Sequence, residues 1–192
     1  MQLLLASKSP RRRELLSSLD LPLSFVDIEV EEQLPHPVSA AHTAEALARL
    51  KASGYDVSLL PHDGVLITAD TVVVLNDRVM GKPHDEKEAF EMLQSLSGVQ
   101  HQVYTGVCLS SRTHQQSFTE CTHVWFKHLS PHEIQYYIDH YRPFDKAGAY
   151  GIQEWIGRIG IQRIDGCFYN VVGLPVARLN QELQTFFSNP LS

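Results

Sequence analysis

The sequence predicts an α/β protein with a mixed β-sheet, because two kinds of strand pattern follow one another along the chain. In the first half, continuous apolar runs alternate with helical patterns, as in parallel βαβ units. In the second half, segments of alternating polar and apolar residues come in pairs joined by polar turns, which is typical of antiparallel hairpins. No repeat, low-complexity tract or linker interrupts this order. Residues 1–192 are therefore predicted to form one domain, which leaves room for two lobes around a cleft.

The composition excludes several classes of protein. A hydrophobic fraction of 43% and a charged fraction of 20% are those of an ordinary globular domain, and a net charge of -6 argues against a broad surface for nucleic acid or anionic membranes. The three cysteines are far apart, so neither a disulfide framework nor a cysteine zinc site is indicated, and buried free thiols are expected. Because there is no signal-type leader and no apolar stretch of bilayer length, we expect a protein of the cytoplasm without a membrane span.

The first strand and turn carry an unusual cluster of charge. The apolar run Leu3–Leu5 predicts a strand, and Pro10 opens a helix for which Ser9 is a good N-cap. Arg11–Arg13 then occupy the first helical turn, where the helix dipole is already positive. Three guanidinium groups are unfavourable there unless an anion shares the site, so the stretch fits a phosphate site. Three solvated arginines on a surface helix are the alternative, and this stretch alone does not decide between them.

The next elements bring a carboxylate to the end of a buried strand. A short strand is predicted over Ser24–Val30, a helix over Ala40–Ser53, and a continuously apolar strand from Gly64 that reaches Asp70 and continues to Leu75. Ligands of α/β sheets bind at such strand ends, so a partly desolvated Asp70 is a candidate to bind a metal ion or to take a proton from water. An aspartate that only caps the following turn is the alternative.

The remaining elements follow from turn and capping residues. They are a turn at Asn76–Asp77 into Val79 and Met80, a helix capped by Asp85 and ending near Leu96, a hairpin of Gln102–Ser110 and Phe118–His128, a helix starting at Ser130–Pro131, a second hairpin of Gly160–Ile164 and Phe168–Val172 around Asp165–Gly166, and a terminal helix from Leu174–Pro175.

Other charged residues are candidates only in combination. Glu31 or Glu32, after the second strand, offers a further carboxylate of the kind that hard cations such as Mg²⁺ prefer, although a solvated edge is the alternative. Lys51 lies on a helix face with small residues, and Lys82 lies between Gly81 and Pro83. Either lysine can hold a phosphate as a point charge, although most lysines are simply solvated.

The loop Asp145–Gln153 combines glycines with a bulky ring and ends in an amide. Glycine permits close approach of the backbone to a ligand, and an amide supplies both a donor and an acceptor, which suits the edge of thymine or uracil. A loop that only packs against its neighbours is equally compatible with these residues. The sequence has no G-x-x-x-x-G-K-[ST], G-x-G-x-x-G or H-E-x-x-H motif, so phosphate chemistry of the P-loop or Rossmann kind and a histidine metal site are not predicted.

Motifs in a fixed order extend over nearly the whole chain. They are Ala6-Ser7-Lys8-Ser9-Pro10-Arg11-Arg12 with Glu14-Leu15-Leu16, Ala69-Asp70-Thr71, Gly81-Lys82-Pro83, Leu96-Ser97-Gly98, His101-Gln102-Val103, Thr105-Gly106-Val107, the nine residues from Asp145 to Gln153, and Val172-Gly173-Leu174-Pro175. Together they resemble the Maf family of nucleotide pyrophosphatases.

This resemblance implies a cytoplasmic, metal-dependent, homodimeric enzyme that cleaves a nucleoside triphosphate to the monophosphate and pyrophosphate. It also implies a long, mixed, twisted sheet with two lobes around a central cleft, related to inosine triphosphatases. Asp70 matches the family's proton acceptor, whereas Arg11, Thr71 and Gln153 match positions linked to substrate choice. The pattern of these three is similar to that of the branch acting on dTTP and UTP.

The chemistry of the residues agrees with these implied roles. Ser7 and Ser9 with Arg11 and Arg12 would hold phosphates, and Lys51 and Lys82 would neutralise the charge that develops on transfer. Glu32 and Asp70 would anchor Mg²⁺ or Mn²⁺, and Asp70 would activate the attacking water. The choice of Glu32 over Glu31 follows from the alignment with the family pattern.

Two residues depart from the family pattern. Many relatives have glycine where this chain has Glu154, and Asp where it has Cys167. Two alternatives to a dTTP and UTP pyrophosphatase stay open, which are a house-cleaning pyrophosphatase for modified nucleotides and a non-catalytic nucleotide-binding regulator of cell division. A nucleic-acid-binding module ranks last because of the negative charge.

Overall fold

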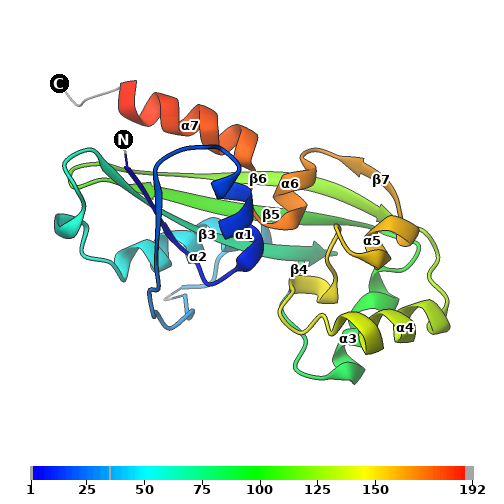
Figure 1. Cartoon of the computed structure of the whole chain (residues 1–192). Helices are drawn as coiled ribbons and strands as arrows, with labels where there is room; N and C mark the ends of the chain where they lie inside the picture. The colour runs from blue at the N-terminus through cyan, green and yellow to red at the C-terminus, as the bar shows by residue number, and fades with distance from the viewer. Residues whose placement is uncertain (1, 35, 189–192) are drawn as a thin grey trace. The chain divides into compact units, whose positions relative to one another are not determined.

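The structure is a computed structural model that describes residues 2–34 and 36–188. The chain divides into two compact units (Figure 1). The first unit comprises Met1–Asp70, Thr105–Glu120 and Gly173–Ser192, and the second comprises Thr71–Tyr104 and Cys121–Val172. None of the helices in the described part of the chain is both long and apolar enough to cross a membrane.

Seven strands form one mixed sheet. Their order is β2-β1-β3-β5-β6-β7, with β4 paired to β3. β1 pairs in parallel with β2 and β3, whereas β3–β4 and β6–β7 are antiparallel. The strands are β1 (Gln2–Ala6), β2 (Leu23–Val26), β3 (Gly64–Leu75), β4 (Arg78–Met80), β5 (Gln100–Ser110), β6 (Gln115–Phe126) and β7 (Ile161–Asp165). The predicted mixed sheet flanked by helices is thus confirmed.

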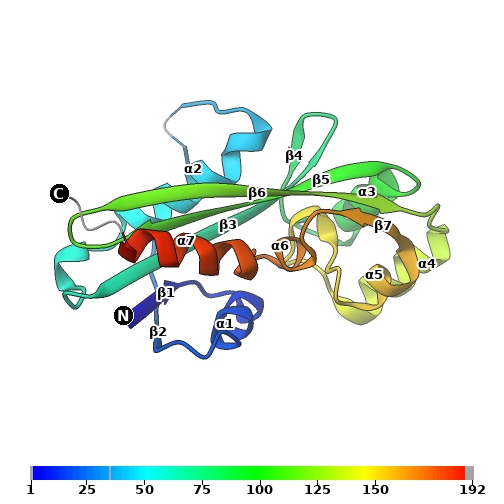
Figure 2. The ribbon, with the colours of Figure 1, turned by 90° about the horizontal axis from the view of Figure 1, so that it is seen from above.

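In the first unit, the two faces of β1 and β3 carry different helices: α1 (Pro10–Ser17), α2 (Ala40–Ser53) and α7 (Val176–Ser188). Odd-numbered residues such as Val65 and Ile67 pack in one cluster with Leu16 of α1 and with the apolar face of α7. Even-numbered Leu66 instead packs with Ala48 of α2. Figures 1 and 2 show α7 and α2 on opposite sides of the strands. The parity of a residue on β3 therefore decides which helix it meets.

The second unit has its own core beneath its helices. These are α3 (Glu86–Leu96), α4 (Pro131–Tyr141), α5 (Trp155–Gly160) and α6 (Phe168–Val172), with a short 3-10 turn at Ala147–Ala149. Asp85 caps α3 by accepting the N–H of Glu88, and Ser130 and Glu133 form a reciprocal capping box on α4. Both helix starts were predicted from these capping residues, and both are confirmed.

Two predicted strands are wrong in extent or in kind. The strand predicted over Ser24–Val30 ends at Val26, and the strand predicted over Phe168–Val172 is the short helix α6. β7 therefore pairs with β6 and not with residues 168–172. The Thr122 hydroxyl bonds both the N–H and the carbonyl of Cys167, at 3.0 and 3.1 Å. The buried Asn170 amide donates to the Val103 carbonyl at 3.0 Å. These bonds satisfy polar groups that α6 brings inward, which alternation of residue types does not reveal.

The cysteines are free thiols, as expected. Cys108 is buried, whereas Cys121 and Cys167 are only half-buried, so the expectation of burial is confirmed for one of the three.

Candidate active site

Three charged side chains of the first unit meet at one point. The Lys51 ammonium lies 2.5 Å from a carboxylate oxygen of Asp70 and 3.0 Å from one of Glu32. Lys51 comes from α2, and Asp70 from the face of β3 that packs on this helix. The Thr68 hydroxyl, on the same face, donates to the Ala48 carbonyl of α2 at 2.6 Å and fixes the helix against the strand. The meeting of these charges thus follows from the packing of two regular elements.

The three side chains are desolvated to different degrees. The exposed fraction is 13% for the Asp70 side chain, 20% for Lys51 and 53% for Glu32. A carboxylate as buried as that of Asp70 is costly unless an opposite charge or hydrogen bonds compensate it, and Lys51 supplies that charge. Glu32 reaches the same ammonium from the solvent side. The arrangement presents two carboxylates that converge on one cationic position.

Arg12 and Arg13 of α1 have different partners, and Arg11 is half-buried. Arg12 donates from Nε to the Gly173 carbonyl at 2.8 Å. Burial lowers the pKa of Arg12 from its ordinary value; the charge of Arg11 adds to this, and the charges of Asp70 and Glu32 oppose it. Arg12 is therefore a cation held in the electric field of the Asp70 carboxylate.

Arg13 braces the loop that precedes α1. It donates from Nε to the Ser7 carbonyl at 2.7 Å and from Nη2 to the Asp27 carboxylate at 2.9 Å. Its guanidinium also lies 5.0 Å from the centre of the Phe25 ring. Arg12 and Arg13 are thus tied into the fold, and the interpretation of three solvated arginines does not describe them.

Ser7 and Ser9 form a compact turn at the start of α1. The Ser7 hydroxyl oxygen accepts the N–H of Ser9 at 3.2 Å, and the Ser9 hydroxyl oxygen accepts the N–H of Arg12 at 3.5 Å. The predicted capping role of Ser9 is confirmed. Since a hydroxyl accepts and donates at once, each serine keeps a hydrogen that can be given to an anion.

The donor set of this cluster suits a hard divalent cation. Among the described residues, no three side chains of His, Cys, Asp or Glu gather closely enough to hold a metal ion by themselves. Mg²⁺, however, is usually held by one or two carboxylates, with water and substrate phosphates completing its shell. Glu32 and Asp70 already direct one oxygen each at the same ammonium. The pair therefore fits Mg²⁺ or Mn²⁺ brought with a phosphorylated substrate.

In the second unit, Gly148 contacts two other segments that carry predicted site residues, namely those of Thr71 and Lys82. Its φ of +67° is in the left-handed region, and its N–H donates to the Gly81 carbonyl at 3.0 Å. A Cβ at this position would lie 3.0 Å from the Val73 side chain. Thr71 is on the same face of β3 as Val73, opposite to the face of Asp70. Thr71 and the exposed Lys82, next to Gly81, thus lie on segments that contact the Asp145–Gln153 loop.

The glycine at position 148 therefore serves packing. The alternative of a packing loop, which the sequence left open, describes Gly148 better than close approach to a ligand. Gln153, at the end of the loop, behaves differently. Its side-chain oxygen is buried and has no hydrogen-bond partner among the described residues. An unpaired buried amide oxygen is costly, so this atom is a strong candidate to accept a hydrogen bond from a ligand.

Sequence reasoning missed the residues that hold this loop. Lys146 pairs with Asp145 at 2.6 Å and with Glu154 at 3.2 Å, and the Tyr137 hydroxyl donates to Glu154. The sequence alone indicates no role for Tyr137, in the helix that starts at Ser130–Pro131, or for Lys146, in the Asp145–Gln153 loop. No local signal could have found them, because the burial of Lys146 and its pairing with Glu154 arise from tertiary packing.

The core beneath the loop contains a buried histidine. His101 is 2% exposed, lies 2.7 Å from the Tyr150 hydroxyl and stacks on Phe126. Burial lowers the pKa of His101 to about 4, so the ring is neutral at physiological pH. His101 therefore stabilises the loop as an uncharged group, through its contact with Tyr150.

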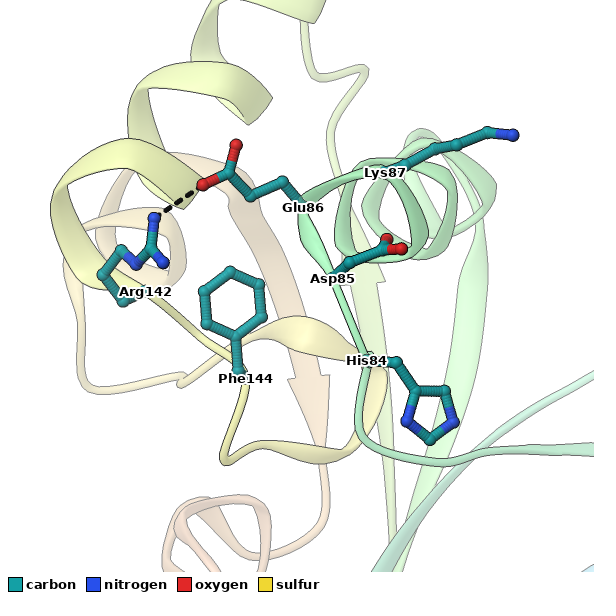
Figure 3. A pocket seen from close by; sticks show the side chains of 6 residues that line it. All are labelled: His84, Asp85, Glu86, Lys87, Arg142 and Phe144. Carbon is teal, nitrogen blue, oxygen red and sulfur yellow. Dashed lines mark hydrogen bonds and ion pairs between the residues drawn. The ribbon is translucent and has the colours of Figure 1, made fainter.

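None of the predicted site residues lines the surface pocket of the second unit that Figure 3 shows. It has a volume of about 480 Å³ and is lined by His84, Asp85, Glu86, Lys87, Arg142 and Phe144. Glu86 and Arg142 pair at 2.6 Å, and the Arg142 guanidinium lies 4.7 Å from the centre of the Phe144 ring. Two of its charged residues, Glu86 and Arg142, are thus paired with each other.

Comparisons with known proteins agree with the residue pattern. Residues 2–186 match the family model described as "Maf-like protein". A protein of Bacteroides thetaiotaomicron named dTTP/UTP pyrophosphatase is 49% identical over 95% of both chains. Proteins of the same name are 50% identical in Phocaeicola vulgatus, again over 95% of both chains, and 49% identical in Porphyromonas gingivalis, over 96% of this chain and 94% of that one. The solved Staphylococcus aureus Ham1 protein matches 66% of this chain and 72% of its own with a TM-score of 0.44 and 14% identity. The chain belongs to the Maf family.

Proposed function

We propose that this protein is a nucleoside triphosphate pyrophosphatase that hydrolyses dTTP and UTP to the nucleoside monophosphate and pyrophosphate. The observation that carries the proposal is the convergence of Asp70, Lys51 and Glu32 beside Arg12, in a chain whose close relatives are named dTTP/UTP pyrophosphatase. Such a cluster joins a base, cations for phosphates and a pair of carboxylates for a metal ion.

In this proposal Asp70 activates the attacking water. Water adds to a phosphorus of the α–β anhydride, its proton passes to the Asp70 carboxylate, and the bond between the bridging oxygen and that phosphorus breaks. Lys51 holds the carboxylate from one side at 2.5 Å and is placed to neutralise charge that grows on the phosphates. A divalent cation held by Glu32 and Asp70 would neutralise phosphate charge and ease the deprotonation of water.

The start of α1 is proposed to bind the phosphate chain. Arg11 and Arg12 supply guanidinium groups, and Ser7 and Ser9 supply hydroxyl donors. The bonds that fix Arg12 to Gly173 and the two serines to backbone N–H groups support this role, because they order the donors before substrate binds. Lys82, exposed on the second unit, is assigned to the phosphates as a further point charge.

Gln153 is proposed to recognise the base. Thymine and uracil carry an N–H at position 3 and a carbonyl at position 4, so an amide can accept from the first and donate to the second. The buried oxygen of Gln153, for which residues 2–34 and 36–188 offer no hydrogen-bond partner, supports the accepting half of this pairing. Cytosine has no hydrogen at position 3 and is disfavoured. Thr71 is retained as a second residue that affects substrate choice, through the face of β3 that contacts the loop of Gln153.

The proposal has a cellular and oligomeric part. The family model extends over residues 2–186, which supports one Maf-like domain for residues 1–192. The family resemblance supports a homodimer in the cytoplasm, and the net charge of -6 supports a protein that binds no nucleic acid and no membrane. Sedimentation at micromolar concentration tests the dimer, which a monomer mass would contradict.

The test of the reaction is pyrophosphate release from a panel of nucleoside triphosphates, with Mg²⁺ or Mn²⁺ and with excess chelator. We expect selective turnover of dTTP and UTP over CTP and the purine nucleotides, and loss of turnover with chelator. An amide that forms hydrogen bonds with positions 3 and 4 of the pyrimidine ring does not contact position 5. The panel therefore includes triphosphates that are modified at position 5. Preferred turnover of those compounds would favour the house-cleaning alternative, and nucleotide binding without turnover would favour the regulator.

A further inference from the structure

The residue after Gln153 is a carboxylate with two partners inside the protein. One oxygen of Glu154 lies 3.2 Å from the Lys146 ammonium, and the other accepts the hydroxyl of Tyr137. The exposed fraction is 8% for the Lys146 side chain and 20% for Glu154, and Tyr137 is fully buried. Because both oxygens are used by the protein, Glu154 is poorly placed to bind a base or a metal ion itself.

Tyr137 connects Glu154 to the backbone of the loop. Its hydroxyl oxygen accepts the N–H of Gly151 at 3.0 Å while its hydrogen is given to Glu154. Burial raises the pKa of Tyr137 above its ordinary range, and the bond to Glu154 raises it further, so the hydroxyl keeps the hydrogen that it donates. A Cβ on residue 151 would lie 2.9 Å from the Glu154 carboxyl carbon, so Gly151 leaves the room that this side chain needs.

These contacts fix the loop on both sides of Gln153. At its start, Lys146 also bonds Asp145 at 2.6 Å. At its end, the N–H of Glu154 donates to the Gly151 carbonyl at 3.0 Å and closes a tight turn with Gln153 inside it. Gln153 therefore lies between two residues that are bonded to Tyr137, so the backbone that carries its side chain is held on both sides.

We propose that Glu154 is a positioning residue for base selectivity, acting through Tyr137 and Lys146 to hold the amide of Gln153. This inference rests on the proposed function, because it takes Gln153 to contact the base. It assigns a role to Glu154, the residue that directly follows the Asp145–Gln153 loop. In this chain the acid narrows the choice of base by ordering the loop.

The experiment compares Glu154→Gln and Tyr137→Phe with the wild type. Glutamine keeps the shape and an acceptor for Tyr137 but loses the charge facing Lys146, and phenylalanine removes the bridge while keeping the ring in the core. We expect KM for dTTP to rise by about 10-fold, kcat to stay unchanged, and the preference for dTTP over CTP in kcat/KM to fall by about 10-fold. Hydrogen exchange of the Gly151 amide should become faster in both variants.

Glu133→Gln is the matched control. Glu133 pairs with Lys127 at 2.6 Å in the same unit and is similarly half-buried, but it belongs to the capping box of α4. This variant should lower the melting temperature while leaving KM and the preference between dTTP and CTP unchanged. The control thus distinguishes a general loss of stability, which lowers only the melting temperature, from a loss of positioning, which changes KM and base preference.

Two results would overturn the inference. One is a Glu154→Gln or Tyr137→Phe protein that is folded by circular dichroism and keeps the wild-type KM and base preference. The other is a change in base preference as large in the Glu133→Gln control. Failure of the proposed function is recognised separately, because the wild type itself would then turn over neither dTTP nor UTP.

Discussion

The two units use their charged residues in different ways. In the first unit, Lys51 and Asp70 stand on a helix and a strand that pack together, and their charges converge where Glu32 is still half-exposed. In the second unit, Lys146 is almost fully buried against Glu154. The first set of charges can exchange partners with an incoming phosphate or cation, whereas the second set is locked into the fold.

The two sets of charges therefore have different roles. Those of the first unit are available for the reaction, whereas those of the second unit hold the loop of the neutral Gln153 in place. In the second unit, the buried side-chain atoms that have no hydrogen-bond partner among the described residues include the amide oxygen of Gln153, which precedes Glu154 in the sequence. Reaction type should therefore depend on the first unit, and base preference on the second. Variants that change only turnover or only base preference would support this division between the units. Variants that change both together would contradict it.

Among the variants that test this comparison, the largest effect is expected from Lys51→Met. The change removes the cation between Glu32 and Asp70, and turnover of dTTP should fall by about 100- to 1,000-fold because one preorganised charge on the phosphates is lost. The two carboxylates then face each other without compensation, so MgCl₂ without nucleotide should raise the melting temperature more than in the wild type. Equal thermal shifts would show that the carboxylates do not form a cation site.

His101→Phe tests the core of the second unit through its pH dependence. The pKa of His101 is lowered to about 4 in the folded chain, against an ordinary value of 6.5. Below the ordinary value the unfolded chain takes up a proton that the folded chain does not. Stability is therefore lost as the pH falls from about 6.5 to about 4, amounting to about 2 kcal/mol by pH 5.

Phenylalanine removes this contribution, so the difference in urea unfolding free energy between wild type and variant should change with pH over that window. Parallel curves for the two proteins would contradict a neutral buried His101. The other histidines are common to both proteins and cancel in the comparison.

Gln153→Met separates base recognition from stability. Methionine has a similar shape but no amide. The loss of transition-state stabilisation should therefore be about 1–3 kcal/mol, which lowers kcat/KM for dTTP, and the preference for dTTP over CTP should disappear. Because the variant removes a buried oxygen that has no hydrogen-bond partner in the described part of the chain, its melting temperature should stay the same or rise. A marked loss of stability would mean that Gln153 has a structural role.

The smallest effect is expected from Arg13→Ala. Arg13 braces the Ser7 carbonyl but is partly exposed, so its removal should cost about 1 kcal/mol of unfolding free energy and raise KM for dTTP without changing base preference. Lys8→Ala, which removes an exposed pair with Glu29 at 3.2 Å, is the control and should change neither quantity. An equal effect of both variants would argue against a specific brace.

The parts of the site on regular elements could be predicted from the sequence. An apolar run that ends in Asp70 predicts a strand reaching a ligand site, and the face of α2 that carries Lys51 follows from helical spacing. The capping role of Ser9 follows from its position before Pro10. These predictions depend on contacts between neighbours in the sequence or on one face of one element.

The parts that could not be predicted depend on long-range hydrogen bonds. Tyr137 and Glu154 are 17 residues apart, and nothing in the helical pattern of α4 shows that the Tyr137 hydroxyl reaches this loop. The misassigned strand over Phe168–Val172 has the same cause, because Asn170 of α6 is satisfied by Val103 and Thr122 at distant positions in the sequence. A polar group whose hydrogen-bond partner lies on another helix or strand produces no recognisable pattern in its own stretch of sequence.

The most direct test of the central claim is pyrophosphate release from dTTP by wild type and by Asp70→Asn, with Mg²⁺. Asparagine keeps the shape of the side chain but cannot take a proton from water. The account predicts that the wild type releases pyrophosphate and dTMP in equal amounts, and that the variant still binds dTTP but loses turnover. Full turnover by a folded Asp70→Asn protein would contradict the account.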